Sequence, residues 1–217
     1  MEELKNNSVE VGGKMAHAPV MLSEMLAWLA PKEGGIYIDG TFGAGGYSRA
    51  ILATADCKVY AIDRDPSTKK FAEVLAKEFP NRFVWILGNF ADMCELLAEQ
   101  GVDSVDGIVL DLGVSSMQLD IAERGFSFRN DGDLDMRMSD EGISAADVIA
   151  TASVDELADI FYYYGEEKAS RRVARAIEAA RRIEPITRTL QLAEIIRSAI
   201  PSKPSKTHPA TRSFQGL

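Results

Sequence analysis

Short apolar runs alternate with amphipathic stretches along the first half of the chain. The apolar runs are rich in β-branched and aromatic residues and predict strands over Ile36–Ile38, Val59–Ile62, Phe83–Leu87 and Gly107–Leu110. Between them, apolar residues recur at helical spacing and predict helices over Pro19–Leu29, Tyr47–Ala53, Pro66–Lys77 and Asp92–Glu99. This alternation is typical of a parallel α/β sheet, and near-continuous apolar strands indicate that both faces are covered.

The pattern changes after the fourth strand. Residues Gly113–Ser139 form a long stretch rich in Gly, Asp, Arg and Phe, and structureless loops of this length are usually functional. Two capping boxes begin at Ser144 and Ser153, and helices are predicted over Glu166–Arg182 and Thr189–Ile200. A basic, Pro-containing loop follows at 202–207. We therefore expect a smaller helical unit, inserted after the fourth strand.

Composition is that of an ordinary globular protein, with 46% hydrophobic residues in 217. The N-terminus, residues 1–13, is polar, lacks the apolar core of a signal peptide and is expected to be a disordered tail; no apolar run approaches a membrane span. Cys57 and Cys94 make no disulfide framework, which fits a cytoplasmic, reducing environment. The histidines, His17 and His208, stand far apart, and no metal site is expected.

Charge is distributed unevenly along the chain. The net charge of −9 argues against a nucleic-acid partner. However, residues 1–165 hold 13 basic and 28 acidic side chains, whereas residues 166–217 hold 11 basic and 5 acidic ones. A basic segment on an acidic body can bind phosphates, and a solvated helix face is the alternative.

The stretch from Tyr37 to Tyr47 combines a strand end, a glycine turn and a helix start. Gly43, Gly45 and Gly46 fall in the turn, a geometry that lets backbone approach a nucleotide closely. Sixteen residues after Tyr47, the second strand ends in Asp63, which can accept hydrogen bonds from both ribose hydroxyls. Together these features indicate an adenosine-containing cofactor, and a glycine-rich turn without function is the alternative.

The order of residues in the turn favours S-adenosylmethionine over NAD. A dinucleotide motif, G-x-G-x-x-G, places a pyrophosphate on a helix N-terminus. Here Asp39 leads the turn, where it would repel a pyrophosphate and could hold a cationic amino-acid end. S-adenosylmethionine has that cation and no phosphate.

Polar or aromatic groups follow each of the four predicted strands: Asp39, Asp63, Asn89 with Phe90, and Asp111. Ligands of open α/β sheets bind beyond the carboxyl ends of the strands. One strand-end acid is often a helix cap, but four such ends around one crevice predict a binding site.

Three carboxylates alternate in the long loop, at Asp131, Asp133 and Asp135. A calcium loop would need Gly at the sixth position and Glu at the twelfth, where this chain has Met136 and Gly142. We expect Asp133 and Asp135 instead to anchor the neighbouring arginines at 129 and 137, or to cap turns.

From these residues the chain resembles the bacterial RsmH (MraW) family of 16S ribosomal RNA cytosine-N4 methyltransferases. The matching stretches run from His17 nearly to the last residue: His17–Glu24, Tyr37–Gly46, Ala61–Pro66, Asp106–Ser116, Gln118–Asp120, Ala122–Phe128, Leu134–Met138, Tyr164–Glu167, His208–Arg212 and Phe214–Gln215. The loop 122–138 is the most specific of them, because a generic methyltransferase does not need it.

The resemblance implies a Rossmann-like class I S-adenosylmethionine-dependent methyltransferase fold with an inserted helical subdomain. It also implies cofactor contacts, which fall at Gly45, Gly46, Tyr47, Asp63, Phe90, Asp111 and Gln118. The domain boundaries are then a methyltransferase domain at 14–116, a loop and helical insert for RNA recognition at 117–207, and the start of a return to the methyltransferase domain at 208–217.

Three departures from the family pattern stand out. The family usually has His in place of Tyr47 and Pro in place of Asp133. Family members also continue well past the Phe-Gln pair at 214–215, so we expect a C-terminally truncated chain with an incomplete sheet. The fourth strand or its neighbour would then present an uncovered apolar edge.

The expected reaction is methylation of a cytosine amine in 16S rRNA at the decoding centre of the small ribosomal subunit. The amine lone pair is delocalised into the ring, so the site must polarise an N–H and hold the amine in line with the methyl sulfonium. Asp111 is the candidate acceptor, and no catalytic base is assigned. A methyltransferase for another substrate and a truncated, non-catalytic relative that binds RNA or a partner are the alternatives. The oligomeric state stays open, with a homodimer as one candidate.

Overall fold

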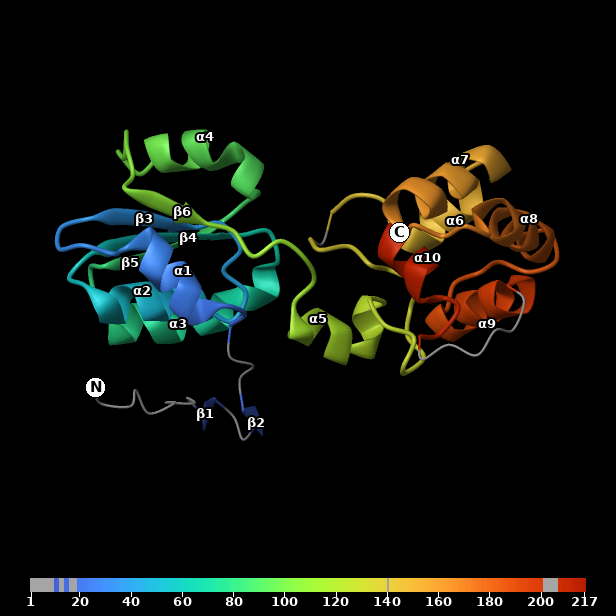
Figure 1. Ribbon diagram of the computed structural model, residues 1–217, viewed down its shortest axis with the longest axis horizontal. Coiled ribbons are helices and arrows are strands. Elements are labelled where there is room, and N and C mark those ends of the chain that lie inside the picture. The colour runs from blue at the N-terminus through green and yellow to red at the C-terminus, as the bar shows by residue number, and fades with distance from the viewer. Residues whose placement is uncertain (1–9, 12–13, 16–18, 140, 201–206) are drawn as a thin grey trace. The chain divides into compact units, whose positions relative to one another are not determined.

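A computed structural model describes residues 10–11, 14–15, 19–139, 141–200 and 207–217. Contacts between Cα atoms divide the chain into two compact units, residues 1–113 and 114–217, each with its own core (Figure 1). None of the helices in the described ranges is long and apolar enough to cross a membrane.

A parallel four-stranded sheet forms the centre of the first unit. Its strands are β3 (Ile36–Asp39), β4 (Lys58–Asp63), β5 (Phe83–Leu87) and β6 (Gly107–Val109), in the order β5-β4-β3-β6. Tyr37 of β3 pairs with Val59 on one side and with Gly107 on the other. The four predicted strands and their parallel arrangement are confirmed, and all four carboxyl ends therefore meet at one edge.

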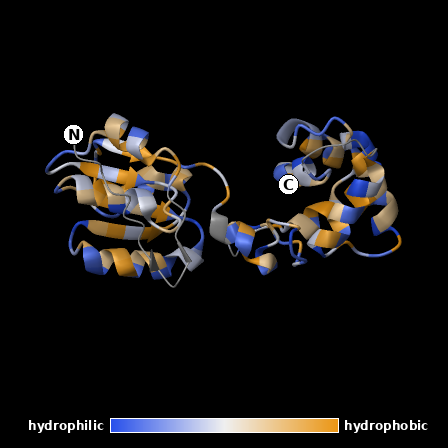
Figure 2. Cartoon of the chain, turned by 60° about the horizontal axis from the view of Figure 1, so that its bottom comes forward, coloured by the Kyte–Doolittle hydropathy of each residue, from blue (hydrophilic) through white to orange (hydrophobic). Residues whose placement is uncertain are grey.

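Helices cover both faces of this sheet, as the apolar strands predicted. The helices are α1 (Leu22–Leu29), α2 (Gly46–Thr54), α3 (Lys69–Glu78) after a 3₁₀ turn η1 (Pro66–Thr68), and α4 (Met93–Ala98) after a 3₁₀ turn η2 (Phe90–Asp92). Residues of α1, α2 and α3 pack with Val59 and Ala61 on one face, whereas α4 packs with Ile38 and Ile62 on the other. Figure 2 shows the hydrophobic residues gathered on the strands, with mixed helices around them.

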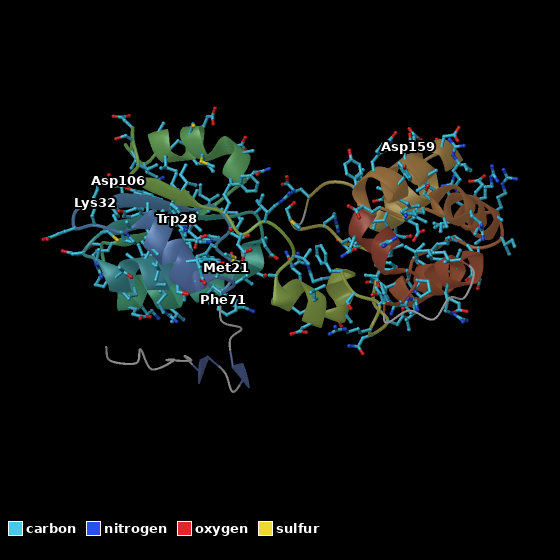
Figure 3. The ribbon with its side chains drawn as sticks, in the orientation of Figure 1. Met21, Trp28, Lys32, Phe71, Asp106 and Asp159 are labelled. Carbon is cyan, nitrogen blue, oxygen red and sulfur yellow. The ribbon has the colours of Figure 1, made fainter. Side chains whose placement is uncertain are left out.

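An ion pair fixes β6 beside β3. Lys32 and Asp106, both labelled in Figure 3, bring Nζ and Oδ1 to 2.6 Å, and Asp106 Oδ2 accepts a hydrogen bond of 2.9 Å from the backbone N–H of Ile36. Beyond β6 no strand pairs in the part of the chain that the structure describes, and Ile108 and Leu110 are exposed. The expected uncovered apolar edge is confirmed.

The N-terminal region is described only in part. Residues Glu10–Val11 (β1) pair antiparallel with Lys14–Met15 (β2). The remaining residues of the expected disordered tail, and His17, lie outside the described residues.

The second unit is helical. It contains α5 (Ser116–Asp120), a 3₁₀ turn η3 (Ala122–Arg124), α6 (Ala145–Thr151), α7 (Val154–Asp159), a π-helix η4 (Ile160–Tyr164), α8 (Ser170–Arg181), α9 (Thr189–Ala199) and α10 (Thr211–Gly216). Its core joins Leu134 of the long loop to Leu157, Phe161, Ile177 and Leu192 of the helices. The basic loop predicted at 202–207 lies outside the described residues except for Thr207.

The predicted helix starts at Ser144 and Ser153 are confirmed, because both residues form complete capping boxes. The helix predicted from Glu166 begins later, at Ser170, because Glu166 has a φ of 53°, which a right-handed helix cannot contain. Residues 208–217, expected at the start of the return to the methyltransferase domain, form α10 and pack in the helical core. The domain assignment itself stays a prediction.

The long loop is more ordered than its composition suggested. It contains α5 and η3, and Arg137 Nη2 lies 2.6 Å from Asp135 Oδ2, as expected. The expected pairing of Asp133 with Arg129 is wrong. Asp133 Oδ1 accepts from Arg188 Nη1 at 2.6 Å, and Asp131 Oδ2 accepts from Arg188 Nε at 3.0 Å. One arginine from the start of α9 therefore holds two of the three loop carboxylates.

Candidate functional site

The glycine turn between β3 and α2 is shaped by close packing. Gly45 is the N-cap of α2 with a φ of 81°, and a Cβ there would lie 2.7 Å from the ring of Phe42. A Cβ on Gly46 would lie 2.4 Å from Pro19 Cγ. Both positions thus exclude a side chain, and the turn brings its backbone N–H groups to the carboxyl edge of the sheet.

Asp39 holds this turn together from inside. The side chain is fully buried, and its carboxylate accepts hydrogen bonds from Ser48 Oγ at 2.7 Å, Ser48 N at 3.2 Å and Thr41 N at 3.3 Å. Burial raises the pKa of this carboxyl to about 6, against the hydrogen bonds from Ser48 and Thr41. The interpretation of Asp39 as a ligand for a cationic group does not fit, because both oxygens face the turn rather than the edge.

Asp63 closes the turn from the neighbouring strand. Its Oδ2 accepts from Gly43 N at 2.7 Å and its Oδ1 accepts from Asp65 N at 2.9 Å. Desolvation raises the pKa of this carboxyl, and the two backbone hydrogen bonds act in the opposite direction. Each carboxylate oxygen has a second lone pair, so Asp63 keeps acceptor capacity for hydroxyl groups placed at the sheet edge.

Tyr47 and Asp111 connect α2 with the end of β6. The Tyr47 hydroxyl donates to the carbonyl of Val20 at 2.6 Å. Desolvation raises the pKa of Tyr47, and the negative charge of Asp111 raises it further. The N–H of Asp111 donates to Thr41 Oγ1 at 2.7 Å, and the Asp111 side chain is exposed. A carboxylate therefore stands open to solvent beside the glycine turn.

Phe90 lies at the same edge. It begins η2 directly after β5, where Asn89 caps the turn by accepting from Ala91 N at 3.0 Å. A Cβ built on Gly40 would lie 3.1 Å from Phe90 Cβ, so the aromatic residue stands against the end of β3. Its side chain is half-buried and keeps an accessible face.

Gln118 belongs to the second unit, on α5. The residue is buried, and its Oε1 accepts from Ser115 N at 2.8 Å while its own N–H donates to Ser115 Oγ at 3.2 Å. A contact of Gln118 with a cofactor thus stays a prediction, whereas the other six predicted residues all lie in the β3–β6 half of the chain.

Sequence reasoning missed two residues of the turn, Thr41 and Ser48. Each connects two segments: Thr41 joins Asp39 to Asp111, and Ser48 fixes Asp39 to α2. The available signal was the polar Ser48 at the third position of the helix, opposite a strand-end acid.

The groups at this edge suit a ligand with hydroxyl and cationic groups. The acceptors are the carboxylates of Asp63 and Asp111, the donors are backbone N–H groups at the start of α2, and Phe90 offers an apolar face. In the described part of the chain, no three His, Cys, Asp or Glu side chains are grouped to hold a metal ion. The arrangement fits the ribose, amino and adenine groups of S-adenosylmethionine.

Comparison with known proteins places the chain in a family. The model of the MraW methylase family matches residues 14–217. Three curated relatives are each called ribosomal RNA small subunit methyltransferase H. The chain is 55% identical to that of Paramagnetospirillum magneticum over 93% of its own length and 63% of the relative's. It is 57% identical to that of Parvibaculum lavamentivorans, covering 93% and 60%, and 58% identical to that of Gluconobacter oxydans, covering 93% and 62%. The chain thus spans about three fifths of the length of the relatives.

Proposed function

Because the chain belongs to the MraW methylase family, we propose that it carries the cofactor site and RNA-recognition unit of an S-adenosylmethionine-dependent rRNA methyltransferase. Its substrate is a cytosine N4 amine of 16S rRNA in the small ribosomal subunit. The observation that carries this proposal is the grouping of Asp63, Tyr47, Phe90 and Asp111 around one glycine turn. The names of the relatives support the rRNA substrate.

Different residues contact different groups of the cofactor. The backbone at Gly45, Gly46 and Tyr47 admits its methionine end at the start of α2. Asp63 accepts from the ribose hydroxyls, and Phe90 packs on the adenine. For Gln118, a cofactor contact rests on the family resemblance alone. The bound cofactor supplies a methyl group already activated by its sulfonium charge.

Asp111 stands where methyl donor and cytosine amine meet. Its exposed carboxylate can accept a hydrogen bond from the amine N–H, which moves electron density toward the nitrogen lone pair. Tyr47 stands at the start of α2, in place of the His that the family usually carries. The target cytosine must leave its stack to reach this edge.

The domain roles follow from this assignment. We propose that residues 14–116 form the methyltransferase domain and that residues 117–207 recognise RNA. The resemblance places residues 208–217 at the start of a return to the methyltransferase domain, but in this chain they pack in the helical core. The enzyme acts in the cytoplasm on the small subunit, and a homodimer is its proposed assembly.

Calorimetry with S-adenosylmethionine tests the cofactor site on the purified chain. Asp63→Asn removes the carboxylate that faces the ribose and should weaken binding at least ~10-fold, since two charge-assisted hydrogen bonds become neutral ones. Asp103→Asn is the matched control, because Asp103 is an exposed acid before β6 rather than after a strand. Equal affinities of the two variants would contradict the site.

Methyl transfer tests the reaction. Small ribosomal subunits that lack the modification are incubated with the chain and labelled cofactor, and the digested nucleosides are separated. Label in N4-methylcytidine supports the proposal. Label in another nucleoside favours the alternative substrate, and tight cofactor binding without transfer favours a non-catalytic relative.

A further inference from the structure

The second unit contains a cavity far from the glycine turn in sequence. It has a volume of about 480 Å³ and lies between the end of α7, the π-helix η4 and the first turns of α8. The helices α7 and α8 lie side by side (Figure 1) and form its floor with the buried Ala158. None of the predicted site residues contributes to its lining.

The cavity wall is strongly cationic. Four cations line it, Lys168, Arg171, Arg172 and Arg175, against one carboxylate, that of Asp159 on α7 (Figure 3). All four cationic side chains are exposed. The cavity therefore combines high positive charge with free access from solvent.

The pairing of arginines differs between the two ends of α8. At its C-terminal end, Arg181 and Arg182 both bind Glu178, and Arg182 Nη2 lies 2.8 Å from Glu178 Oε1. Within the described residues, no ion pair involves Arg171 or Arg175. Exposed arginines are common on any solvated helix face, so what distinguishes Arg171 and Arg175 is that they line one cavity together with two tyrosines.

Two tyrosines form the opposite side of the cavity. Tyr162 and Tyr163 are 54% and 71% exposed, and their rings meet edge to face with centroids 5.2 Å apart. Both belong to the π-helix, a rare element that often occurs at functional sites. The hydrophobic core uses Phe161 of the same element, so these two exposed rings are not needed for it.

Close packing holds the π-helix in place. A Cβ on Gly165 would lie 2.2 Å from the carbonyl oxygen of Arg212, so the backbone of α10 packs closely against Gly165, the residue after the π-helix. Glu167 N donates to the Phe161 carbonyl at 2.9 Å, and Glu167 Oε1 accepts from Ala169 N at 2.7 Å. The tyrosines and the start of α8 therefore have a fixed spacing.

We propose that this cavity binds one nucleotide of single-stranded RNA, with the base stacked on Tyr163 and the phosphodiester held by Arg171 and Arg175. The inference rests on the proposed function, because it assigns an anchoring point for the RNA substrate. Aromatic faces beside arginines are the usual means of holding unpaired nucleotides, since every base has a π-face and every linkage a charge. A purely anionic ligand, such as an acidic peptide, would use the arginines but not the tyrosines.

Fluorescence anisotropy with a short labelled single-stranded RNA tests the phosphate contact. Arg175→Gln should weaken binding about fivefold at low salt and reduce the slope of log affinity against log salt by about 0.7, the value for one phosphate contact on a single strand. Arg182→Gln removes the same charge at the C-cap of α8, outside the cavity, and should change neither quantity. Equal losses for both variants would overturn the proposal.

Tyrosine variants test the stacking. Tyr163→Ala should weaken RNA binding about 5- to 150-fold, because base stacking contributes roughly 1–3 kcal/mol. Tyr163→Phe keeps the ring and should bind within about twofold of the unchanged chain. If Tyr163→Ala binds normally, or if polyglutamate competes as well as RNA, the site is a general anion site and the proposal fails.

Calorimetry separates this proposal from the proposed function. All cavity variants should bind S-adenosylmethionine with unchanged affinity and keep their circular dichroism spectra. If the unchanged chain binds both cofactor and RNA and the cavity variants bind RNA equally well, the cavity assignment alone is overturned. Loss of cofactor binding in Asp63→Asn with normal RNA binding leaves the cavity assignment intact, so the two sites fail independently.

Discussion

Asp39 makes the stability of the first unit depend on pH in an unusual direction. Burial raises its pKa from 3.8 to about 6, so the folded chain retains a proton that the unfolded chain has lost between these values. Stability therefore falls as pH rises from about 4 to about 6 and stays level above. A shift of about two pKa units at ~1.4 kcal/mol each corresponds to about 3 kcal/mol.

Asp39→Asn removes this titration while keeping the size of the side chain. The variant loses the acceptor for one of the Ser48 hydrogen bonds, which lowers its stability by roughly 1–3 kcal/mol at about pH 4, where Asp39 of the folded unchanged chain is protonated. The unchanged chain should therefore lose about 3 kcal/mol relative to the variant between about pH 4 and about pH 7.

Urea unfolding followed by tryptophan fluorescence measures this difference. Both tryptophans of the chain, Trp28 and Trp85, belong to the first unit, so selective excitation reports on that unit alone. The exposed Asp103, replaced by Asn, serves as the control and should show a flat difference. A constant difference between the unchanged chain and Asp39→Asn across this range would refute the reasoning, as would a relative gain of the unchanged chain with rising pH.

Three further substitutions test local packing and helix capping within each unit. Gly45→Ala places a Cβ at a φ of 81° and 2.7 Å from the ring of Phe42. We expect it to destabilise the first unit by about 1–3 kcal/mol, measured as a lower urea midpoint of tryptophan fluorescence. An unchanged midpoint would contradict the packed turn. Ser144→Ala breaks a complete capping box and should cost about 1 kcal/mol of the second unit, measured by thermal melting of helical circular dichroism; no loss would contradict the cap. Leu134→Ala opens a cavity in the helical core and should lower the stability of the second unit by about 2–5 kcal/mol, measured by the same thermal melting. A smaller loss of stability than that of Ser144→Ala would mean that the loop does not belong to this core.

The strands and their order of appearance were predictable because each is a short apolar run that ends in a turn residue. The orientation of Asp39 was not, since the same strand-end position can point toward a ligand or into the turn, and the partner that decides it, Ser48, lies across the glycines. Predicted contacts of Asp63 and Asp111 with a cofactor depend on their position at the sheet edge, which the parallel order of the strands fixes.

The second unit was harder to predict. Asp133 pairs with Arg188, 55 residues further along the chain, and no local pattern identifies such a partner. The run Tyr162–Tyr164 carries three aromatic residues in a row, which hides the helical period, so the π-helix was not anticipated. The cationic character of the segment was visible in the sequence, but only the three-dimensional packing distinguishes the arginines with partners from those around the cavity.

The π-helix makes the cavity sensitive to insertions and deletions in a way that substitutions do not reveal. A π turn holds one residue more than the α turn it replaces, and each residue of an α-helix advances by ~100° around the axis. Deleting one residue within Ile160–Tyr164 would restore a regular helix with almost the same composition. The remaining tyrosines would then face another side of the bundle, and the arginines of α8 would lose their aromatic counterpart. The number of residues in this segment therefore determines which side of the helical bundle its tyrosines face.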